Sequence, residues 1–244
     1  MPRFHVDQPL GAAGSELSLP PGAARHVQVL RLQPGESITL FDGSGDEWQA
    51  EVLAMGRSEV TVRLGERAAV QRELAQDVTL AVVMPANDRM DGIVEKATEL
   101  GAFAIRPLMS ERSVLRLAGD RAAKKVGHWQ GVAVAACEQS GRTRVTRIEP
   151  VMTLAAWLQA LDVTPPAGER RWLLSPTSAQ ALSAQAAAPR TLVLSGPEGG
   201  LSGAEEDAAR ARGFVAMKLG PRILRADTAP LAVLGWLALS EPSS

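Results

Sequence analysis

The spacing of apolar and polar positions differs between the beginning of the chain and the rest. Three short segments of the first part alternate or are rich in β-branched residues, and turns that contain glycine and serine separate them. They predict strands at 37–42, 48–53 and 60–64, and a short helix is expected before them near residues 20–31. Three strands at this spacing favour a small antiparallel sheet or barrel.

From Asp77 onward the pattern alternates between strands and helices. Residues 78–84 form a continuous apolar run, which is typical of a strand buried on both faces of a parallel sheet. A helix is predicted at 88–100, where the apolar side chains of one face are Met90, Ile93, Val94 and Ala97. Further predicted elements are a helix at 120–139, a loop at 161–170, and strands at 104–108, 171–174, 191–194 and 214–219, the last three each followed by a helical stretch. Repeated strand–helix units predict an α/β fold with a parallel sheet covered by helices.

The composition narrows the class of protein. The 244 residues carry 26 Lys and Arg against 27 Asp and Glu, so the net charge of −1 excludes a globally basic nucleic-acid binder. The single cysteine, Cys137, excludes a disulfide within the chain and a C-x-x-C redox site, and no metal site is predicted. The longest apolar run, 231–239, is too short for a membrane span, and Met1 leads into polar sequence without a signal core. We therefore expect a soluble, cytoplasmic protein that does not bind membranes.

Charge is distributed unevenly along the chain. Residues 1–75 hold seven basic and ten acidic side chains, whereas residues 106–147 hold nine basic and three acidic ones. Such a basic stretch is consistent either with a solvated helix face or with a surface that contacts the phosphates of a nucleic acid.

The run 231–239 is apolar on every face of the helix that it predicts. A helix without a polar face has to be buried on all sides. A domain of this size has few layers, so a second copy of the chain is the expected cover, and burial within one chain is the alternative. The sequence therefore predicts a homodimer.

A glycine-rich segment lies between the strand predicted at 191–194 and the next helix. It reads Leu194-Ser195-Gly196-Pro197-Glu198-Gly199-Gly200-Leu201-Ser202, and Ser202 with Glu205 makes a capping-box pattern that starts the helix. The segment lacks the lysine of a phosphate loop and the spacing of a dinucleotide loop, and acidic residues occupy the first helical turn. Ligands of open α/β sheets sit at the carboxyl ends of strands. The loop therefore suits a cofactor without phosphates, and the carboxylate of Glu198 is compatible with a cationic one. The alternative is a plain turn between strand and helix that binds no ligand.

A second segment of this kind follows the strand predicted at 214–219. It reads Leu219-Gly220-Pro221-Arg222-Ile223-Leu224-Arg225-Ala226-Asp227-Thr228-Ala229-Pro230, in which Asp227 or Thr228 can cap the next helix. Arg222 and Arg225 precede a helix N-terminus, where the helix dipole disfavours cations. We therefore expect them to pair with a carboxylate such as Glu198 or with a ligand, and a pair of surface arginines is the alternative.

These segments, taken together, resemble a known family. The two glycine-bearing segments, Lys96-Ala97-Thr98-Glu99-Leu100-Gly101, Glu138-Gln139-Ser140-Gly141-Arg142, and His26-Val27 with Val29-Leu30-Arg31 are similar to the motifs of the RsmE family. This family comprises bacterial 16S ribosomal RNA uridine N3-methyltransferases of the SPOUT superfamily. The resemblance runs from about Arg3 to Ala238, and although each motif alone is modest, five in the family's order are highly specific.

The resemblance implies a fold, a cofactor and a set of site residues. It implies a PUA-like RNA-binding β-barrel at residues 1–72, then a SPOUT-type α/β methyltransferase domain at 73–244 with a trefoil knot, and a homodimer. The knot loops would lie around Ser175-Pro176, Gly196–Gly200 and Leu219–Leu224. The expected cofactor is S-adenosylmethionine, bound by Leu194, Gly196, Pro197, Glu198, Gly199, Leu219, Gly220, Ile223, Leu224 and Thr228.

The implied substrate is small-subunit ribosomal RNA within the 30S subunit, methylated at N3 of a specific uridine. The residues expected to bind this RNA are His26, Arg31, Arg89, Arg112, Arg116 and Arg142. The expected catalytic residues are Arg225 or Arg142 beside the base, to stabilise the uracil anion, and Glu198 to orient an arginine. None of the three histidines is assigned as a base.

The sequence departs from the family pattern at three places. Ala86 stands in the segment where a lysine is usual, Ala226-Asp227 replaces Thr-Glu, and the proline usual after the Gln-Ser-Gly-Arg motif is missing from 143–148. The first departure puts one RNA-phosphate contact in doubt, and none removes a cofactor loop. The alternatives are methylation of a ribose 2′-hydroxyl or of a tRNA base, and a non-catalytic RNA-binding or assembly factor. A nucleotide-dependent oxidoreductase would need a phosphate fingerprint that is missing here.

Overall fold

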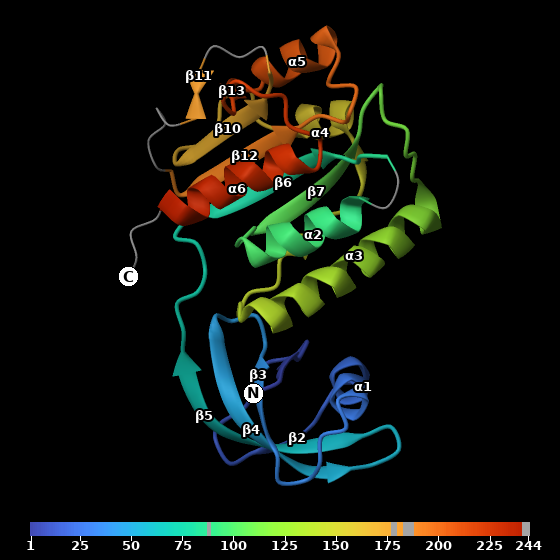
Figure 1. Ribbon diagram of the computed structural model, residues 1–244, viewed down its shortest axis with the longest axis vertical. Coiled ribbons are helices and arrows are strands. Elements are labelled where there is room, and N and C mark those ends of the chain that lie inside the picture. The colour runs from blue at the N-terminus through green and yellow to red at the C-terminus, as the bar shows by residue number, and fades with distance from the viewer. Residues whose placement is uncertain (87–88, 177–179, 183–187, 241–244) are drawn as a thin grey trace. The chain divides into compact units, whose positions relative to one another are not determined.

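A computed structural model describes residues 1–86, 89–176, 180–182 and 188–240 (Figure 1). The chain forms two compact units. The N-terminal unit comprises Met1–Glu73 and Val134–Val145, and the C-terminal unit comprises Leu74–Ala133 and the chain from Thr146 onward. The N-terminal unit thus includes a short segment from the middle of the chain. The domain boundary between residues 72 and 73 stays a prediction.

The N-terminal unit is built on a five-stranded sheet with the order β1-β3-β4-β5-β2. Its elements are β1 (Arg3–His5), β2 (Glu16–Ser18), α1 (Pro21–Val29), β3 (Ser37–Phe41), β4 (Asp46–Met55) and β5 (Val60–Ala69). The neighbouring strands are antiparallel except β1 and β3, which are parallel. Alternate side chains of β4 and β5 enter one core, in which Val27 of α1 is also fully buried. The three strands and the helix predicted here are confirmed.

The C-terminal unit is built on an eight-stranded parallel sheet. Its strands are β6 (Asp77–Val83), β7 (Ala104–Met109), β8 (Arg147–Ile148), β9 (Met152–Thr153), β10 (Glu169–Leu174), β11 (Gln180–Ala181), β12 (Arg190–Ser195) and β13 (Phe214–Lys218). The order is β11-β13-β10-β12-β6-β7-β8, with β9 also paired to β7. Every strand pair in the described part of this sheet is parallel, so the predicted parallel sheet is confirmed.

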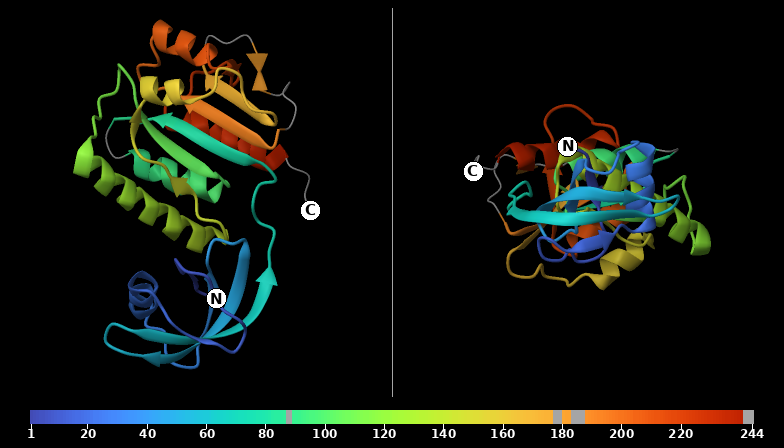
Figure 2. Two further views of the ribbon diagram at one scale, coloured as in Figure 1. Left: turned by 180° about the vertical axis from the view of Figure 1, so that it is seen from behind. Right: turned by 90° about the horizontal axis from the view of Figure 1, so that it is seen from below.

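Helices cover both faces of this sheet, as Figure 1 and the reverse view in Figure 2 show. The helices that contribute to the C-terminal unit are α2 (Arg89–Glu99), α3 (Gly119–Ser140), α4 (Leu154–Ala160), α5 (Gly203–Arg210) and α6 (Thr228–Ser240). The helices α2 and α6 contact each other, and α6 lies against β6 and β12. On the other face α4 and α5 pack on Leu173, Leu194 and Phe214. The sheet is therefore the middle layer of three.

Two predictions fall on residues that the structure does not describe. The predicted start of α2 at Asp88 is one, and most of the helical stretch expected after β10 is the other. The described part of that stretch contains β11 at Gln180–Ala181. Within the described ranges, the structure contains no helix with the length and apolar character that crossing a membrane requires.

Candidate functional site

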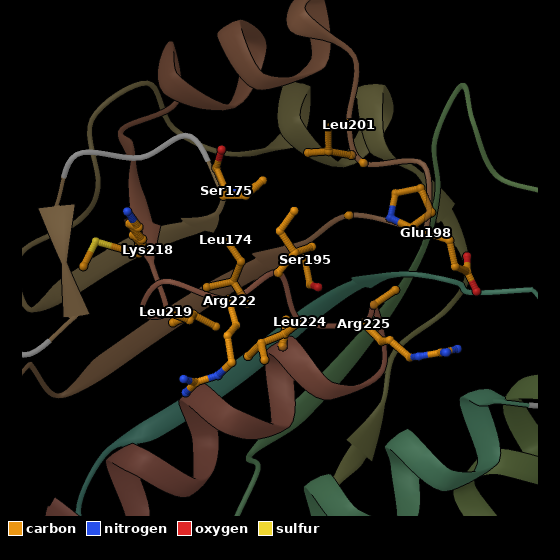
Figure 3. A pocket seen from close by; sticks show the side chains of 18 of the residues that line it. Leu174, Ser175, Ser195, Glu198, Leu201, Lys218, Leu219, Arg222, Leu224 and Arg225 are labelled. Carbon is orange, nitrogen blue, oxygen red and sulfur yellow. The ribbon is translucent and has the colours of Figure 1, made fainter.

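A pocket of about 670 Å³ lies in the C-terminal unit at the carboxyl ends of β10, β12 and β13 (Figure 3). Three segments supply most of its lining, namely 174–176, 195–201 and 217–226, and Arg89, Glu206 and Ala229 complete it. The strands are parallel, so the loops that leave them gather at one edge of the sheet. The pocket is therefore where the two glycine-bearing segments of the sequence meet.

The loop after β12 keeps its backbone close to the pocket. A Cβ atom on Gly196 would lie 3.2 Å from both the backbone N and the Cγ of Leu201, which leaves little room for a side chain. Gly200 has a φ of +66°, and its N–H donates to the carbonyl of Pro197 over 2.8 Å. The loop thus forms a tight turn whose close contacts and left-handed residue require glycine.

The helix that follows this loop begins as predicted. The Ser202 hydroxyl accepts the N–H of Glu205 over 3.3 Å, and the Glu205 carboxylate accepts the N–H of Ser202 over 2.9 Å. Glu206 lies in the same first turn and lines the pocket. It accepts a hydrogen bond from the Ser175 hydroxyl over 3.3 Å, and its hydrogen bond to Arg210 raises the pKa of that guanidinium. Two carboxylates at this helix N-terminus disfavour a phosphate there.

Glu198 ties the pocket loop to the chain after β6. Its carboxylate accepts the N–H of Ala86 over 3.1 Å and a hydrogen bond from Arg89 over 3.5 Å. The Arg89 guanidinium also lies 4.0 Å from Asp227. Glu198 was predicted to orient an arginine, and the arginine that it contacts is Arg89. Figure 3 shows the Glu198 and Arg225 side chains extending on the same side of the pocket, whereas Arg222 extends on the other.

Eight of the ten residues predicted to bind the cofactor line this pocket. The exceptions are Leu194, which is fully buried within β12, and Thr228 at the start of α6. The lining residues that the predicted set omits include Leu174, Ser175, Pro176, Ser195, Leu201 and Met217. Ser175 and Pro176 directly follow a predicted strand and lie in a loop that the resemblance assigned to the knot, so the sequence offered two signals for them.

The arginines predicted to contact RNA have varied surroundings. Arg89 lines the pocket. Arg112 donates to the carbonyl of Gly199 over 2.7 Å, and Arg116 donates to the carbonyl of Glu111 over 3.0 Å. In the N-terminal unit Arg31 is exposed with a φ of +57°. Two of the five predicted arginines, Arg112 and Arg116, therefore have backbone carbonyls as partners.

The motif from Glu138 to Arg142 belongs to the N-terminal unit. The His26 ring lies 3.0 Å from the Glu138 carboxylate, which also accepts the N–H of His5 over 2.9 Å. The Arg142 side chain is 5% exposed and bound to Glu73. Arg142 is not among the residues that line the pocket. The geometry supports a structural role for Arg142, and its predicted catalytic and RNA-binding roles stay predictions.

Among the residues that the structure describes, no group of three or more His, Cys, Asp or Glu side chains could hold a metal ion. The chemistry available to the pocket comes from backbone groups, from apolar side chains, from two serine hydroxyls, and from the charged side chains of Arg89, Glu198, Glu206, Lys218, Arg222 and Arg225.

Comparison with known proteins places these features in a family. The family described as RNA methyltransferase domain matches residues 72–238, and the one described as RNA methyltransferase PUA domain matches residues 19–65. Ribosomal RNA small subunit methyltransferase E of Bacillus subtilis is 34% identical over 218 residues, which are 87% of this chain and 85% of the relative.

Two solved structures share the whole architecture. Ribosomal RNA small subunit methyltransferase E of Neisseria gonorrhoeae, bound to S-adenosyl methionine, matches with a TM-score of 0.89 and 34% identity. A methyltransferase of Legionella pneumophila, in complex with the same cofactor, matches with a TM-score of 0.90 and 30% identity. Each alignment covers 98% of this chain and 97% of the other. With a pocket at the predicted loops and these relatives along nearly its whole length, this chain belongs to the ribosomal RNA small subunit methyltransferase E family.

Proposed function

We propose that this protein methylates N3 of a specific uridine in 16S ribosomal RNA, with S-adenosylmethionine as the methyl donor. The observation that carries the proposal is that the loops after β10, β12 and β13 share one pocket, with Arg225 at its edge. Relatives with the same architecture bind this cofactor and are named for this RNA.

The pocket suits S-adenosylmethionine by size and by charge. Its volume of about 670 Å³ lies within the range of small-molecule sites. Leu174, Leu201, Leu219 and Leu224 offer apolar surface, and the glycines allow backbone groups to approach. The lining carries both signs of charge, because Lys218, Arg222 and Arg225 accompany the carboxylates of Glu198 and Glu206. It therefore suits a ligand with cationic groups and a carboxylate. When bound, S-adenosylmethionine supplies the methyl group as part of a sulfonium.

The protein has to stabilise the uracil anion, because N3 carries a proton at neutral pH. When the pKa of the N3 proton lies two units above the working pH, removing that proton costs about 3 kcal/mol. The Arg225 guanidinium stabilises the negative charge without changing its own, since arginine does not deprotonate. The Glu198 carboxylate accepts a hydrogen bond from Arg89, which keeps a second cation in the lining of the pocket. Fixing the base in line with the methyl group supplies much of the remaining acceleration.

We propose that the RNA is recognised within the 30S subunit by two surfaces. One is the part of the N-terminal unit that carries His26 and Arg31, and the other is the basic stretch 106–147. The net charge of −1 gives no overall attraction to RNA, so local cations have to supply it. This substrate implies that the protein works in the cytoplasm.

We further propose that the protein is a homodimer and that its C-terminal segment is knotted. Support for the dimer comes from α6, which buries Val233, Leu234 and Leu237 but leaves Leu239 89% exposed. Support for the knot comes from its three expected loops, which all line one pocket.

The experiment that tests the function is mass mapping of the nucleotide methylated by the purified protein. The substrate is 30S subunits from cells that lack this gene, and the expected product is one N3-methyluridine in 16S RNA. A methyl group on a ribose would contradict the proposal, as would one on tRNA. Absence of any methylation, with S-adenosylmethionine still bound, would favour a non-catalytic RNA-binding factor.

A further inference from the structure

The peptide group between Gly199 and Gly200 is held at both ends. Its N–H, which belongs to Gly200, donates to the carbonyl of Pro197 over 2.8 Å. Its carbonyl, which belongs to Gly199, accepts a hydrogen bond from Arg112 over 2.7 Å. Arg112 also approaches the carbonyl of Leu201, at 3.5 Å. Two adjacent glycines place little restriction on this peptide, so these partners determine its orientation.

Arg112 also covers the outer side of Gly199. A Cβ atom built on Gly199 would lie 3.6 Å from the Cδ and 3.8 Å from the Cβ of Arg112. The aliphatic part of the arginine therefore packs against the Gly199 Cα, while its guanidinium binds the carbonyl. Arg112 does not line the pocket itself, so its contact with the cofactor loop is from outside.

The segment that carries Arg112 is itself fixed. The Ser113 hydroxyl accepts the N–H of Ser110 over 2.8 Å, and both serines are buried. The N–H of Glu111 donates to the Glu205 carboxylate over 2.9 Å. That carboxylate also accepts the N–H of Ser202 at the start of α5. The segment after β7 therefore contacts the loop after β12 at Gly199 in its middle and, through Glu205, at its end.

We propose that Arg112 is a positioning residue for the cofactor: it locks the Gly199–Gly200 peptide in the orientation that S-adenosylmethionine requires. This inference rests on the proposed function for the identity of the ligand. It departs from the expectation that Arg112 contacts an RNA phosphate, because its guanidinium is bound to the protein's own carbonyls.

The test compares Arg112→Ala with Arg121→Ala, which removes one exposed arginine at the start of α3. Calorimetry measures the affinity for S-adenosylmethionine, and filter binding over a salt series measures the affinity for 16S RNA. We expect Arg112→Ala to weaken cofactor binding about tenfold, as for a lost hydrogen bond to a charged donor. The KM for S-adenosylmethionine should rise in parallel, while kcat at saturating cofactor and the RNA salt slope stay at wild-type values. Arg121→Ala should leave cofactor binding unchanged.

Arg112→Lys distinguishes the hydrogen-bonding geometry of the guanidinium from its positive charge. The lysine side chain keeps the cation but is one bond shorter than the path to the arginine Nη1, so we expect cofactor binding at least threefold weaker than wild type. A thermal melt of each variant reports whether it is folded. If Arg112→Ala is unfolded, Arg112→Lys takes its place in the binding measurements.

Three outcomes are distinguishable. Wild-type protein that binds no S-adenosylmethionine would refute the proposed function itself. Wild-type cofactor affinity in folded Arg112→Ala would overturn the positioning role. A third outcome would establish a phosphate contact instead. In that case Arg112→Ala binds S-adenosylmethionine normally but has an RNA salt slope reduced by about one contact, and Arg112→Lys restores RNA binding.

Discussion

Arg142 and Glu73 form an ion pair in which both oxygens of the carboxylate are occupied. The Arg142 Nε donates to Oε2 over 3.0 Å, while the N–H groups of Thr143 and Arg144 each donate to Oε1 over 3.1 Å. The side chains of the pair are 5% and 15% exposed. Glu73 therefore fixes the turn that ends the Glu138–Arg142 motif as well as its arginine.

Arg142→Ala should destabilise the N-terminal unit by about 3 kcal/mol, because it leaves a nearly buried carboxylate without its cation. Urea unfolding followed by fluorescence measures this loss, and Arg144→Ala, at an exposed neighbour, is the control. A variant as stable as wild type but slow in turnover would return Arg142 to the catalytic role that the sequence suggested.

The sequence predicts elements well where the pattern is local. The apolar run 78–84 and the helical spacing from Met90 to Ala97 were sufficient to predict β6 and α2. The helix α4, at Leu154–Ala160, was missed because seven residues are too few for a periodic apolar stripe. The strand β1 has three residues and exists because β3 pairs with it.

The pocket was predictable in part for the same reason. Glycine-bearing loops can be seen one at a time, but which loops meet depends on the order of the strands. That order places β10 between β12 and β13, so Leu174 and Ser175 complete the pocket from a loop with little signal of its own. The partner of Arg142 lies 69 residues away in the sequence, so no local pattern could reveal that the side chain is buried.

Arg225→Ala should lower turnover about a hundredfold, as for removal of one group that stabilises a developing anion. Its cofactor affinity should remain close to that of wild type, because the proposed role is at the base. Single-turnover methylation and calorimetry measure the two effects. The assignment is wrong if the variant methylates RNA at the wild-type rate.

Gly196→Ala should weaken binding of S-adenosylmethionine, because the added Cβ would meet the backbone N of Leu201 at 3.2 Å and shift the loop. Gly203→Ala is the matched control, since a Cβ there meets nothing within 4 Å. Calorimetry on both variants checks the prediction. Equal affinities for the two would show that the backbone at Gly196 does not shape the site.

The stability of the N-terminal unit should fall as the pH drops below about 6.5, the usual value for histidine. Burial lowers the pKa of His5, and the charges of Asp7, Glu138 and Asp42 oppose that effect without reversing it. The folded state therefore binds fewer protons than the unfolded chain, and its stability is lost as the pH falls towards the lowered pKa.

Urea unfolding at pH 7.5 and 5.5 measures the effect of His5, and His5→Gln should reduce the difference. The substitution retains the backbone N–H that donates to Glu138, so the contact with α3 is preserved. An unchanged pH dependence in His5→Gln would assign the effect to other groups.

Light scattering should give twice the chain mass of 25.8 kDa at micromolar concentration. Leu239→Lys should shift the protein towards the single-chain mass if the exposed side of α6 forms the contact, because it places a charge in an apolar interface. A wild-type protein with the single-chain mass would refute the dimer.

The order of strands in the sheet has a consequence for synthesis on the ribosome. The inner strand β6 pairs with β12, where Asp77 lies opposite Arg190. Since β12 comes more than 100 residues after the start of β6, β6 and β7 emerge long before their neighbour is translated. During that interval the nascent chain presents one unpaired apolar edge, which is the kind of surface that unfinished chains use to aggregate. Of the three segments that line most of the pocket, 195–201 and 217–226 are not translated before β12 is complete, so the pocket cannot form and ligand binding cannot protect the intermediate. Expression of this protein should therefore respond to translation rate and to chaperones that shield unpaired strands.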